Sequence, residues 1–161
     1  GKTQRLQFFL VNGTFHLVDL PGYGYARAPI GVQRQWKHMM QAYLTGRRQL
    51  CGVAQLVDAR HAPSPEDREM IRWLLDEKLA FCLVPTKMDK LRQGERKPAL
   101  GRILGELALP GEQPVVPFSS TTGEGRLALL DWISQTALGA GPAGPDSARP
   151  MQGSEADGAS S

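Results

Sequence analysis

Short apolar runs typical of strands alternate with helical repeats along the first 138 residues, and this alternation most constrains the fold. A hairpin is predicted first, because Asn12-Gly13 joins strand-like runs at 4–11 and 14–19 and both turn positions suit a positive φ. Later strand-like runs lie at 53–57, 80–84 and 115–118, and helical repeats lie at 32–46, 65–78, 95–108 and 126–138. This order predicts an α/β fold, a three-layer α/β/α sandwich with a mostly parallel sheet.

The chain divides into a folded body, residues 1–138, and a tail, residues 139–161. Of the 23 tail residues, 17 are Gly, Ala, Ser or Pro, and no apolar period runs through them. Such a segment cannot bury enough surface to offset its ordering entropy, so we predict a disordered tail. The tail has a net charge of −2 and the whole chain +3, which leaves +5 on the body.

Neither a membrane span nor a disulfide framework is expected. No apolar run approaches the length that crosses a bilayer. The two cysteines, Cys51 and Cys82, are too few for a framework and lie in apolar runs, so we expect both to be reduced and buried. This cysteine usage predicts a cytoplasmic protein.

Short motifs with polar residues lie at the ends of three of the predicted strands, where parallel α/β sheets bind their ligands. The motifs are Asp19-Leu20-Pro21-Gly22, Thr86-Lys87-Met88-Asp89 and Phe118-Ser119-Ser120. An aspartate at a strand end can hold magnesium through water, and a following glycine lets its N–H approach an anionic oxygen. Any one of these motifs is typical of an ordinary polar loop. Together and in this order they resemble the GTPase series of a D-x-x-G loop, an [NT]-K-x-D loop and a short S-A-K-type loop.

The residue types suit a guanine site of that kind. The carboxylate of Asp89 could accept hydrogen bonds from both the ring N1–H and the exocyclic amine, a donor pair that adenine lacks. Lys87 would lay its stem along the base and tie its loop to the phosphate loop, while Thr86 braces the strand end. The backbone N–H of Ser120 would face the guanine carbonyl oxygen.

The sequence in and around these motifs resembles the EngB (YihA/YsxC) family over essentially all of residues 1–138. The matching stretches are Asp19 to Ala26 (DLPGYGYA), Asp58 to Pro63 (DARHAP), Pro85 to Lys90 (PTKMDK), Phe118 to Ser120 (FSS) and Gly1 to Gln4 (GKTQ). The resemblance implies a Ras-like P-loop GTPase, or G domain, that binds GTP or GDP with magnesium and hydrolyses GTP. It also implies a role in assembly of the large ribosomal subunit, with a link to cell division and septation.

The resemblance also assigns individual residues. It places Gly1, Lys2, Thr3, Gln4 and Arg5 at the nucleotide, together with Asp19, Leu20, Pro21 and Gly22, of which Gly22 would donate to the γ-phosphate. The hydroxyl of Thr3 and the carboxylate of Asp19 would hold magnesium. Thr86, Lys87, Met88, Asp89, Phe118, Ser119 and Ser120 complete the expected site.

No catalytic residue is assigned, because Tyr23 stands where many small GTPases place a glutamine that orients water. One reading is slow intrinsic hydrolysis that a partner such as a ribosomal particle accelerates. The other is that Tyr23 packs in the switch while another group orients the water.

Gly1-Lys2-Thr3 could instead end a phosphate-binding loop, but a helix would then have to follow it. Strand and hairpin patterns follow, and Asp19 comes only 16 positions after Thr3, which is too short for a helix, a switch and two strands. We therefore expect an N-terminally incomplete copy with the first strand and the phosphate loop missing. That interpretation predicts a sheet interrupted between the strand at 14–19 and the strand at 53–57, and a chain that binds GTP poorly and is itself inactive.

Three functions stay open at this point. The first is a monomeric nucleotide switch acting on the large ribosomal subunit or its precursor, and the second is a ribosome- or RNA-binding module that no longer binds nucleotide. The third is another translation-type GTPase with a different target. A basic run could contact ribosomal RNA or could equally be a solvated helix face; it consists of Lys87, Lys90, Arg92, Arg96, Lys97 and Arg102.

Overall fold

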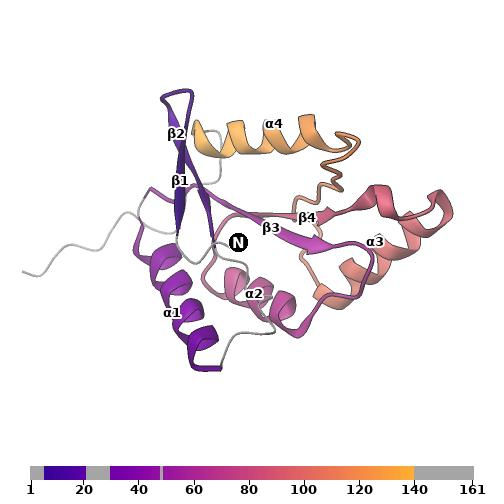
Figure 1. Cartoon of the computed structure of the whole chain (residues 1–161), viewed down its shortest axis with the longest axis horizontal. Helices are drawn as coiled ribbons and strands as arrows, with labels where there is room; N and C mark the ends of the chain where they lie inside the picture. Colours follow the sequence, from indigo (N-terminus) through magenta and orange to yellow (C-terminus); the bar gives the residue numbers. More distant parts are fainter. Residues whose placement is uncertain (1–5, 21–29, 48, 140–161) are drawn as a thin grey trace, which may run out of the picture.

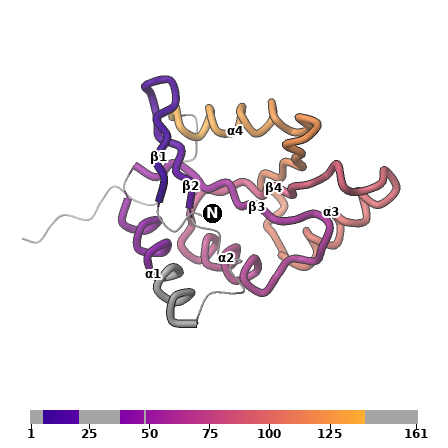
Figure 2. Tube along the Cα trace, viewed as in Figure 1, coloured from indigo at the N-terminus to yellow at the C-terminus, as the bar shows by residue number. Residues whose placement is uncertain are grey.

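The structure is a computed structural model that describes residues 6–20, 30–47 and 49–139, with side chains of the first helix described from residue 38. Its strands are β1 (Gln7–Val11), β2 (Phe15–Asp19), β3 (Val53–Asp58) and β4 (Phe81–Thr86). Its helices are α1 (Ile30–Gly46), α2 (Pro65–Asp76), α3 (Gln93–Leu107) and α4 (Arg126–Ala137), with a 3-10 turn, η1 (Met88–Lys90), after β4. Figures 1 and 2 follow the chain through these elements. The predicted alternation is confirmed up to the last predicted strand.

The opening hairpin forms around the predicted Asn-Gly turn. Asn12 and Gly13 have φ values of 49° and 66°, and the N–H of Thr14 donates to the carbonyl of Val11 at 2.9 Å. Val11 pairs with Phe15, so β2 begins one residue later than the sequence suggests. One face of the hairpin packs on α1, where the rings of Phe8 and Tyr43 meet edge to face at 6.1 Å.

Parallel pairing joins β3 to β4, with Val53 opposite Phe81 and Asp58 opposite Thr86. On the other side of β4 the extended segment 114–118 runs parallel to it. The N–H of Val116 donates to the carbonyl of Leu83, and the N–H of Phe118 donates to that of Pro85. The strand predicted at 115–118 is reduced to a single bridge between Leu83 and Val115, because Pro85 of β4 has no N–H to donate to the carbonyl of Val116 and so cannot continue the ladder.

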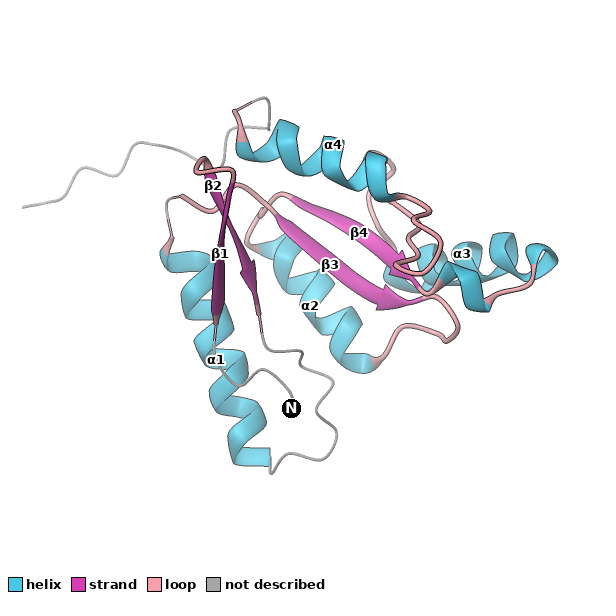
Figure 3. Ribbon diagram, turned by 45° about the horizontal axis from the view of Figure 1, so that its top comes forward, coloured by secondary structure: helices cyan, strands magenta, loops and turns pink. Residues whose placement is uncertain are grey.

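The described strands fall into two separate two-stranded sheets, β1–β2 and β3–β4, as Figure 3 shows. The interruption predicted between the strands at 14–19 and 53–57 is therefore confirmed. Its consequence is visible in the side chains: Leu17 of β2 and Leu56 of β3 are 49% and 56% exposed. Leu17 pairs with Phe9 and so lies on the face of the hairpin opposite to Phe8, which packs on α1, and no described strand other than β1 lies beside β2.

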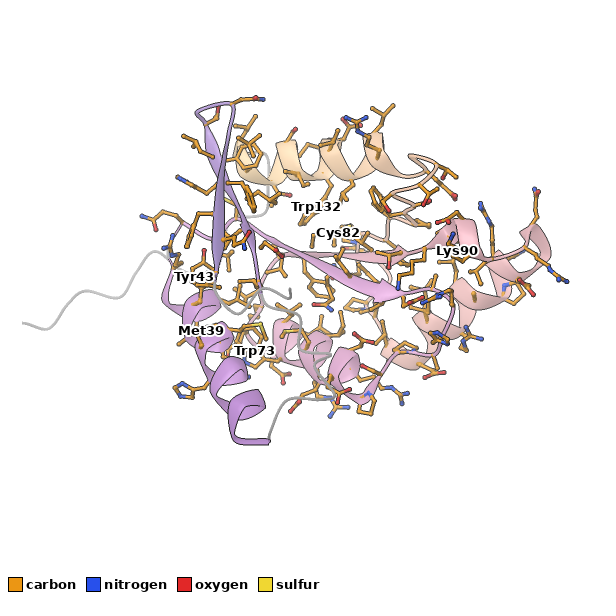
Figure 4. All side chains as sticks on the ribbon, viewed as in Figure 1. Met39, Tyr43, Trp73, Cys82, Lys90 and Trp132 are labelled. Atoms are coloured by element: carbon orange, nitrogen blue, oxygen red, sulfur yellow. The ribbon has the colours of Figure 1, made fainter. Side chains whose placement is uncertain are left out.

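Helices cover both faces of β3–β4 and make the layered arrangement of Figure 1. On one face, α2 and α3 enclose the core, which contains Ile71, Leu74, Phe81, Leu83, Ile103 and Leu107. On the other face lies α4, whose Trp132 points toward the sheet near Cys82 in Figure 4. The approach is close, since a methyl group on Gly52 would lie 2.7 Å from Cγ2 of Thr136.

The two cysteines differ in exposure. Cys82 in β4 is buried and free, and burial raises the pKa of its thiol to about 11. Cys51 is also free but exposed, so the expectation of burial was wrong for it. It lies two residues before β3, in the connection from α1, and does not share the core-facing register of the strand. None of the helices in the described part of the chain is long and apolar enough to cross a bilayer.

Helix α2 begins with a reciprocal cap. The hydroxyl of Ser64 accepts from the N–H of Asp67 at 3.1 Å, and the N–H of Ser64 donates to the Asp67 carboxylate at 2.8 Å. We expect Ser64→Ala to lower the free energy of unfolding by about 1 kcal/mol, because an N–H at the helix start loses its partner. Urea denaturation measures the change, and Ser134→Ala, at an exposed position inside α4, is the control that should be nearly neutral.

Candidate functional site

The carboxyl ends of β3, β4 and the segment 114–118 meet at one end of the sheet. Their parallel direction brings them there: Asp58 ends β3 opposite Thr86, which ends β4. The arrowheads of β3 and β4 point the same way in Figure 3, toward α3. The N–H of Met88 donates to the carbonyl of Phe118 at 3.2 Å, which ties the loop after β4 to the loop after residue 118.

The loop after β4 is held from both sides. The hydroxyl of Thr86 donates to the carbonyl of Val57 at 2.9 Å and so links the ends of β3 and β4. Lys87 then takes a left-handed backbone conformation with φ 62°, and Met88 is buried against the core. After this turn Lys87 is exposed and Asp89 is half-buried, and Figure 4 labels the next residue, Lys90.

The side chain of Asp89 is fixed by the neighbouring loop. The hydroxyl of Ser119, a fully buried residue, donates to Oδ1 of Asp89 at 2.7 Å. The same hydroxyl accepts from the N–H groups of Thr121 and Thr122 at 3.2 Å each, which fixes the direction of its proton. On the other oxygen, Nζ of Lys90 lies 3.1 Å from Oδ2. The Ser119 hydroxyl first, and Lys90 second, hold the pKa of Asp89 below its ordinary value.

We expect Ser119→Ala to raise the pKa of Asp89 toward its ordinary value, because the main group that favours the ionised form is removed. A depressed pKa stabilises the fold above the unfolded-state value of about 3.9, and the stabilisation is lost as the pH falls through the folded pKa. The deficit of the variant should therefore be largest near neutral pH and shrink in acid below about pH 4. Carboxyl-detected NMR titration and urea denaturation at several pH values measure both effects, with Ser120→Ala as the exposed control.

The loop that carries Ser119 closes on itself before α4. The N–H of Ser119 donates to the carbonyl of Glu124 and the N–H of Gly123 donates to the carbonyl of Ser119. An ion pair of 3.0 Å between Arg96 and Glu124 fastens this loop to α3. Ser120 lies exposed at its tip, and its N–H has no acceptor within the described part of the chain. That N–H is thus available to an oxygen of a ligand.

A second charged cluster lies at the end of β3, and the sequence alone did not point to its pairing. Asp58 Oδ2 lies 2.7 Å from Nη2 of Arg60 and 2.8 Å from Nζ of Lys87. Arg60 first, and then Lys87, hold the pKa of Asp58 well below its usual range, and Asp58 in turn raises that of Arg60. Two signals were available: an arginine two residues after a strand-end aspartate, and the resemblance of the stretch from Asp58 to Pro63 to the EngB family.

The remaining expected site residues are placed less completely. Asp19 and Leu20 lie at the end of β2, in the other sheet, and no hydrogen bond or ion pair between described residues joins them to the loops at 86–89 and 118–120. The other expected residues lie outside the described residues; they are Gly1, Lys2, Thr3, Gln4, Arg5, Pro21, Gly22 and Tyr23. The tail from residue 140 also lies outside them.

Asp19 is suited to magnesium in one respect. Asp19 is exposed, and none of the described side chains pairs with its carboxylate. Magnesium keeps several of its waters and is usually bound by one or two carboxylates together with phosphate oxygens. Within the described ranges there is no group of three or more His, Cys, Asp or Glu that could hold a metal. A single carboxylate therefore fits an ion that a bound phosphate also holds.

A layered α/β frame with these two loops at its strand ends defines a Ras-like G domain. No family model matches the chain, but individual relatives do. It is 42% identical over 139 residues to a probable GTP-binding protein EngB of Levilactobacillus brevis, covering 86% of this chain and 71% of that protein. It is also 42% identical over 134 residues to a probable GTP-binding protein EngB of Thermotoga petrophila, covering 83% of this chain and 69% of the relative.

A solved structure agrees in fold. The crystal structure of a probable GTP-binding protein engB superimposes with a TM-score of 0.67 at 18% identity, over 76% of each chain. With the sequence relatives above, the conclusion is direct: the chain belongs to the EngB family of GTP-binding proteins.

Proposed function

We propose that this chain binds GTP and GDP through the loops at 86–89 and 118–120, hydrolyses GTP, and serves as a nucleotide switch in assembly of the large ribosomal subunit. The proposal extends to a link with cell division and septation and to a monomer in the cytoplasm. Membership of the EngB family supports it. The observation that carries it is the Asp89 carboxylate, kept ionised and oriented by the buried hydroxyl of Ser119.

The proposed recognition of guanine follows from hydrogen-bond chemistry. A carboxylate has about four acceptor positions, so Asp89 can keep its bond from Ser119 and still accept from N1–H and the 2-amino group of guanine. Adenine presents no such pair of donors. The N–H of Ser120, which has no acceptor among the described residues, would donate to the guanine carbonyl oxygen, and the stem of Lys87 would lie against the ring.

The proposed phosphate end involves residues on the other sheet and outside the described residues. Asp19 would hold magnesium through a water and Thr3 through its hydroxyl, while Gly22 would donate its N–H to the γ-phosphate. Leu20, Pro21 and the residues from 1 to 5 would line the same region. Bound magnesium would neutralise charge on the phosphates. We assign no residue to the orientation of the attacking water.

Isothermal titration with GDP and with ADP, each with magnesium, tests nucleotide recognition. The 161 residues contain no G-x₄-G-K-[ST] motif, so we expect weak binding and design the experiment around selectivity. GDP should bind about 100-fold more tightly than ADP, because adenine has no N1–H or 2-amino group to donate hydrogen bonds to the Asp89 carboxylate. Equal affinities, combined with binding to large ribosomal subunits, would favour an RNA-binding module without nucleotide recognition. Hydrolysis of GTP by these 161 residues alone should be close to background, because the phosphate-loop motif is missing from them, and large ribosomal subunits are expected to raise it.

Helix α3 offers the basic surface for a ribosomal partner. Its exposed basic residues, counting the one just before its first turn, are Arg92, Lys97 and Arg102. Arg96 differs, because its ion pair with Glu124 holds the loop before α4 against α3. A charge reversal should therefore be made at Lys97 and Arg102, and Arg96 should be left intact.

We expect Lys97→Glu with Arg102→Glu to weaken binding to large ribosomal subunits about tenfold and to lower the salt slope by about two, because two phosphate contacts are lost. Sedimentation binding assays over a range of salt concentrations measure both. Arg72→Glu with Arg126→Glu, exposed residues on α2 and α4, makes the same charge change elsewhere. If this control pair has an equal effect, net charge alone attracts the chain and α3 is not the contact surface.

A further inference from the structure

We propose that Asp58 and Arg60 are positioning residues for the guanine site, and that Asp58 acts by holding the ammonium group of Lys87. The proposal rests on the proposed function, because it assigns Lys87 to the face of a guanine ring. It adds two residues to that site, Asp58 at the end of β3 and Arg60 in the turn that follows it. Neither belongs to the loops at 86–89 and 118–120.

The register of the sheet makes the contact possible. Asp58 at the end of β3 is directly opposite Thr86 at the end of β4. Lys87 is the next residue after Thr86, so it lies close to the Asp58 carboxylate on the neighbouring strand. Its Nζ lies 2.8 Å from Oδ2 of Asp58, and the side chain therefore crosses from the end of β4 to the end of β3. The Lys87 side chain remains 51% exposed, so its methylene groups are open to a ligand while its charged end is held.

Arg60 fixes the carboxylate that holds Lys87. Its Nε lies 2.9 Å from Oδ1 and its Nη2 lies 2.7 Å from Oδ2, so one planar group spans both oxygens of Asp58. The backbone N–H of Arg60 also donates to Oδ1 at 3.1 Å. A fork of this kind fixes the plane of a carboxylate in a way that a single point charge does not. The Asp58 oxygen that faces Lys87 is therefore oriented before any ligand arrives.

This anchoring has a physical benefit for binding. A free lysine samples many rotamers, and ordering it around a ligand lowers the affinity. The backbone of Lys87 is fixed in the turn after β4, and the Asp58 carboxylate restrains the far end of its side chain. The cost of ordering the stem is then met during folding, which leaves a prepared surface for an aromatic ring.

A double-mutant cycle on GDP affinity tests the proposal in the whole chain. Asp58→Asn keeps the shape of the side chain and removes its charge, and Lys87→Met keeps an apolar stem and removes the ammonium. We expect Asp58→Asn to weaken GDP binding about fivefold, the size expected of a partly exposed ion pair. In the Lys87→Met background the same change should have less than a twofold effect. Arg60→Met should weaken binding by about half as much, because Lys87 keeps its partner while the carboxylate loses its fork.

Matched controls separate this role from a structural one. Glu106→Gln removes a comparable ion pair, the 3.0 Å contact with Arg68 between α2 and α3, and should leave GDP affinity unchanged. Thermal unfolding of each variant shows whether the fold is retained. Two outcomes would overturn this inference and leave the proposed function intact. One is an Asp58→Asn effect on GDP affinity that persists in the Lys87→Met background. The other is no Asp58→Asn effect at all in a chain that still prefers GDP over ADP. If the unmodified chain does not prefer GDP over ADP, the proposed function fails and this inference fails with it.

Discussion

Replacing Gly125 with alanine is expected to lower the free energy of unfolding by about 3 kcal/mol, the largest of the stability effects we predict. Two causes add together. The residue has φ 76°, a conformation that alanine adopts only at a cost, and a Cβ there would lie 2.1 Å from the carbonyl oxygen of Pro117. The displaced oxygen belongs to the segment that leads into Ser119, so the damage reaches the site. Urea denaturation followed by tryptophan fluorescence measures the loss.

Gly123 is the matched control for this substitution. It has a similar φ of 79°, but no atom of the described residues lies within 4 Å of the position that its Cβ would take. Gly123→Ala should therefore cost only the backbone term, about 1 kcal/mol. Equal costs for the two substitutions would mean that the Pro117 carbonyl does not press on Gly125 in solution.

Replacing Asp89 with asparagine is expected to weaken GDP binding by about 100-fold or more and to create binding of xanthosine diphosphate. Under the proposed function, one oxygen of Asp89 accepts a hydrogen bond from the 2-amino group of guanine. In the asparagine variant the amide NH2 takes the place of that oxygen. One hydrogen bond is then lost, and the NH2 of asparagine faces the 2-amino group of guanine, donor against donor. Xanthine carries a carbonyl oxygen at that ring position and keeps its N1–H. The amide can therefore pair with both groups. Isothermal titration with the two diphosphates measures the exchange.

The control for this substitution is Asp131→Asn, which removes one carboxylate charge from an exposed position on α4. It should leave both affinities unchanged. If Asp89→Asn lowers GDP binding without any gain for xanthosine diphosphate, and the fold is intact, Asp89 supports the loop and does not read the base. The hydroxyl of Ser119 can donate to the amide oxygen of asparagine as it does to Oδ1 of Asp89, so the loop is expected to hold.

Local sequence was enough for most of the secondary structure. A turn that needs two positive φ values marked the hairpin, because this signal depends only on neighbouring residues, and the Ser64-Pro65 pair at the start of α2 is a signal of the same local kind. The two loops at 86–89 and 118–120 were also recognisable, since each is a short motif at a strand end. The strand at 115–118 was overestimated because the missing donor lies on the neighbouring strand: Pro85 of β4 has no N–H to give to the carbonyl of Val116.

Contacts between distant residues needed the tertiary structure. The hydroxyl of Ser119 meets Asp89 across 30 residues of sequence, and Lys87 meets Asp58 across 29, so no spacing rule relates either pair. The same holds for exposure: Leu17 and Cys51 have ordinary apolar surroundings in sequence and are nevertheless exposed. Burial depends on which elements pack on each face, a property of the assembled layers.

By itself, then, the sequence determined the order of strands and helices, the interruption between the two strand pairs and the loops that resemble a guanine site. Periodicity, turn chemistry and short motifs act over a few residues, and each leaves a pattern that can be read directly. Only the tertiary structure decided which carboxylate Ser119 orients and which one holds Lys87. Those pairings depend on strand register, which places residues from separate strands at the same end of a sheet.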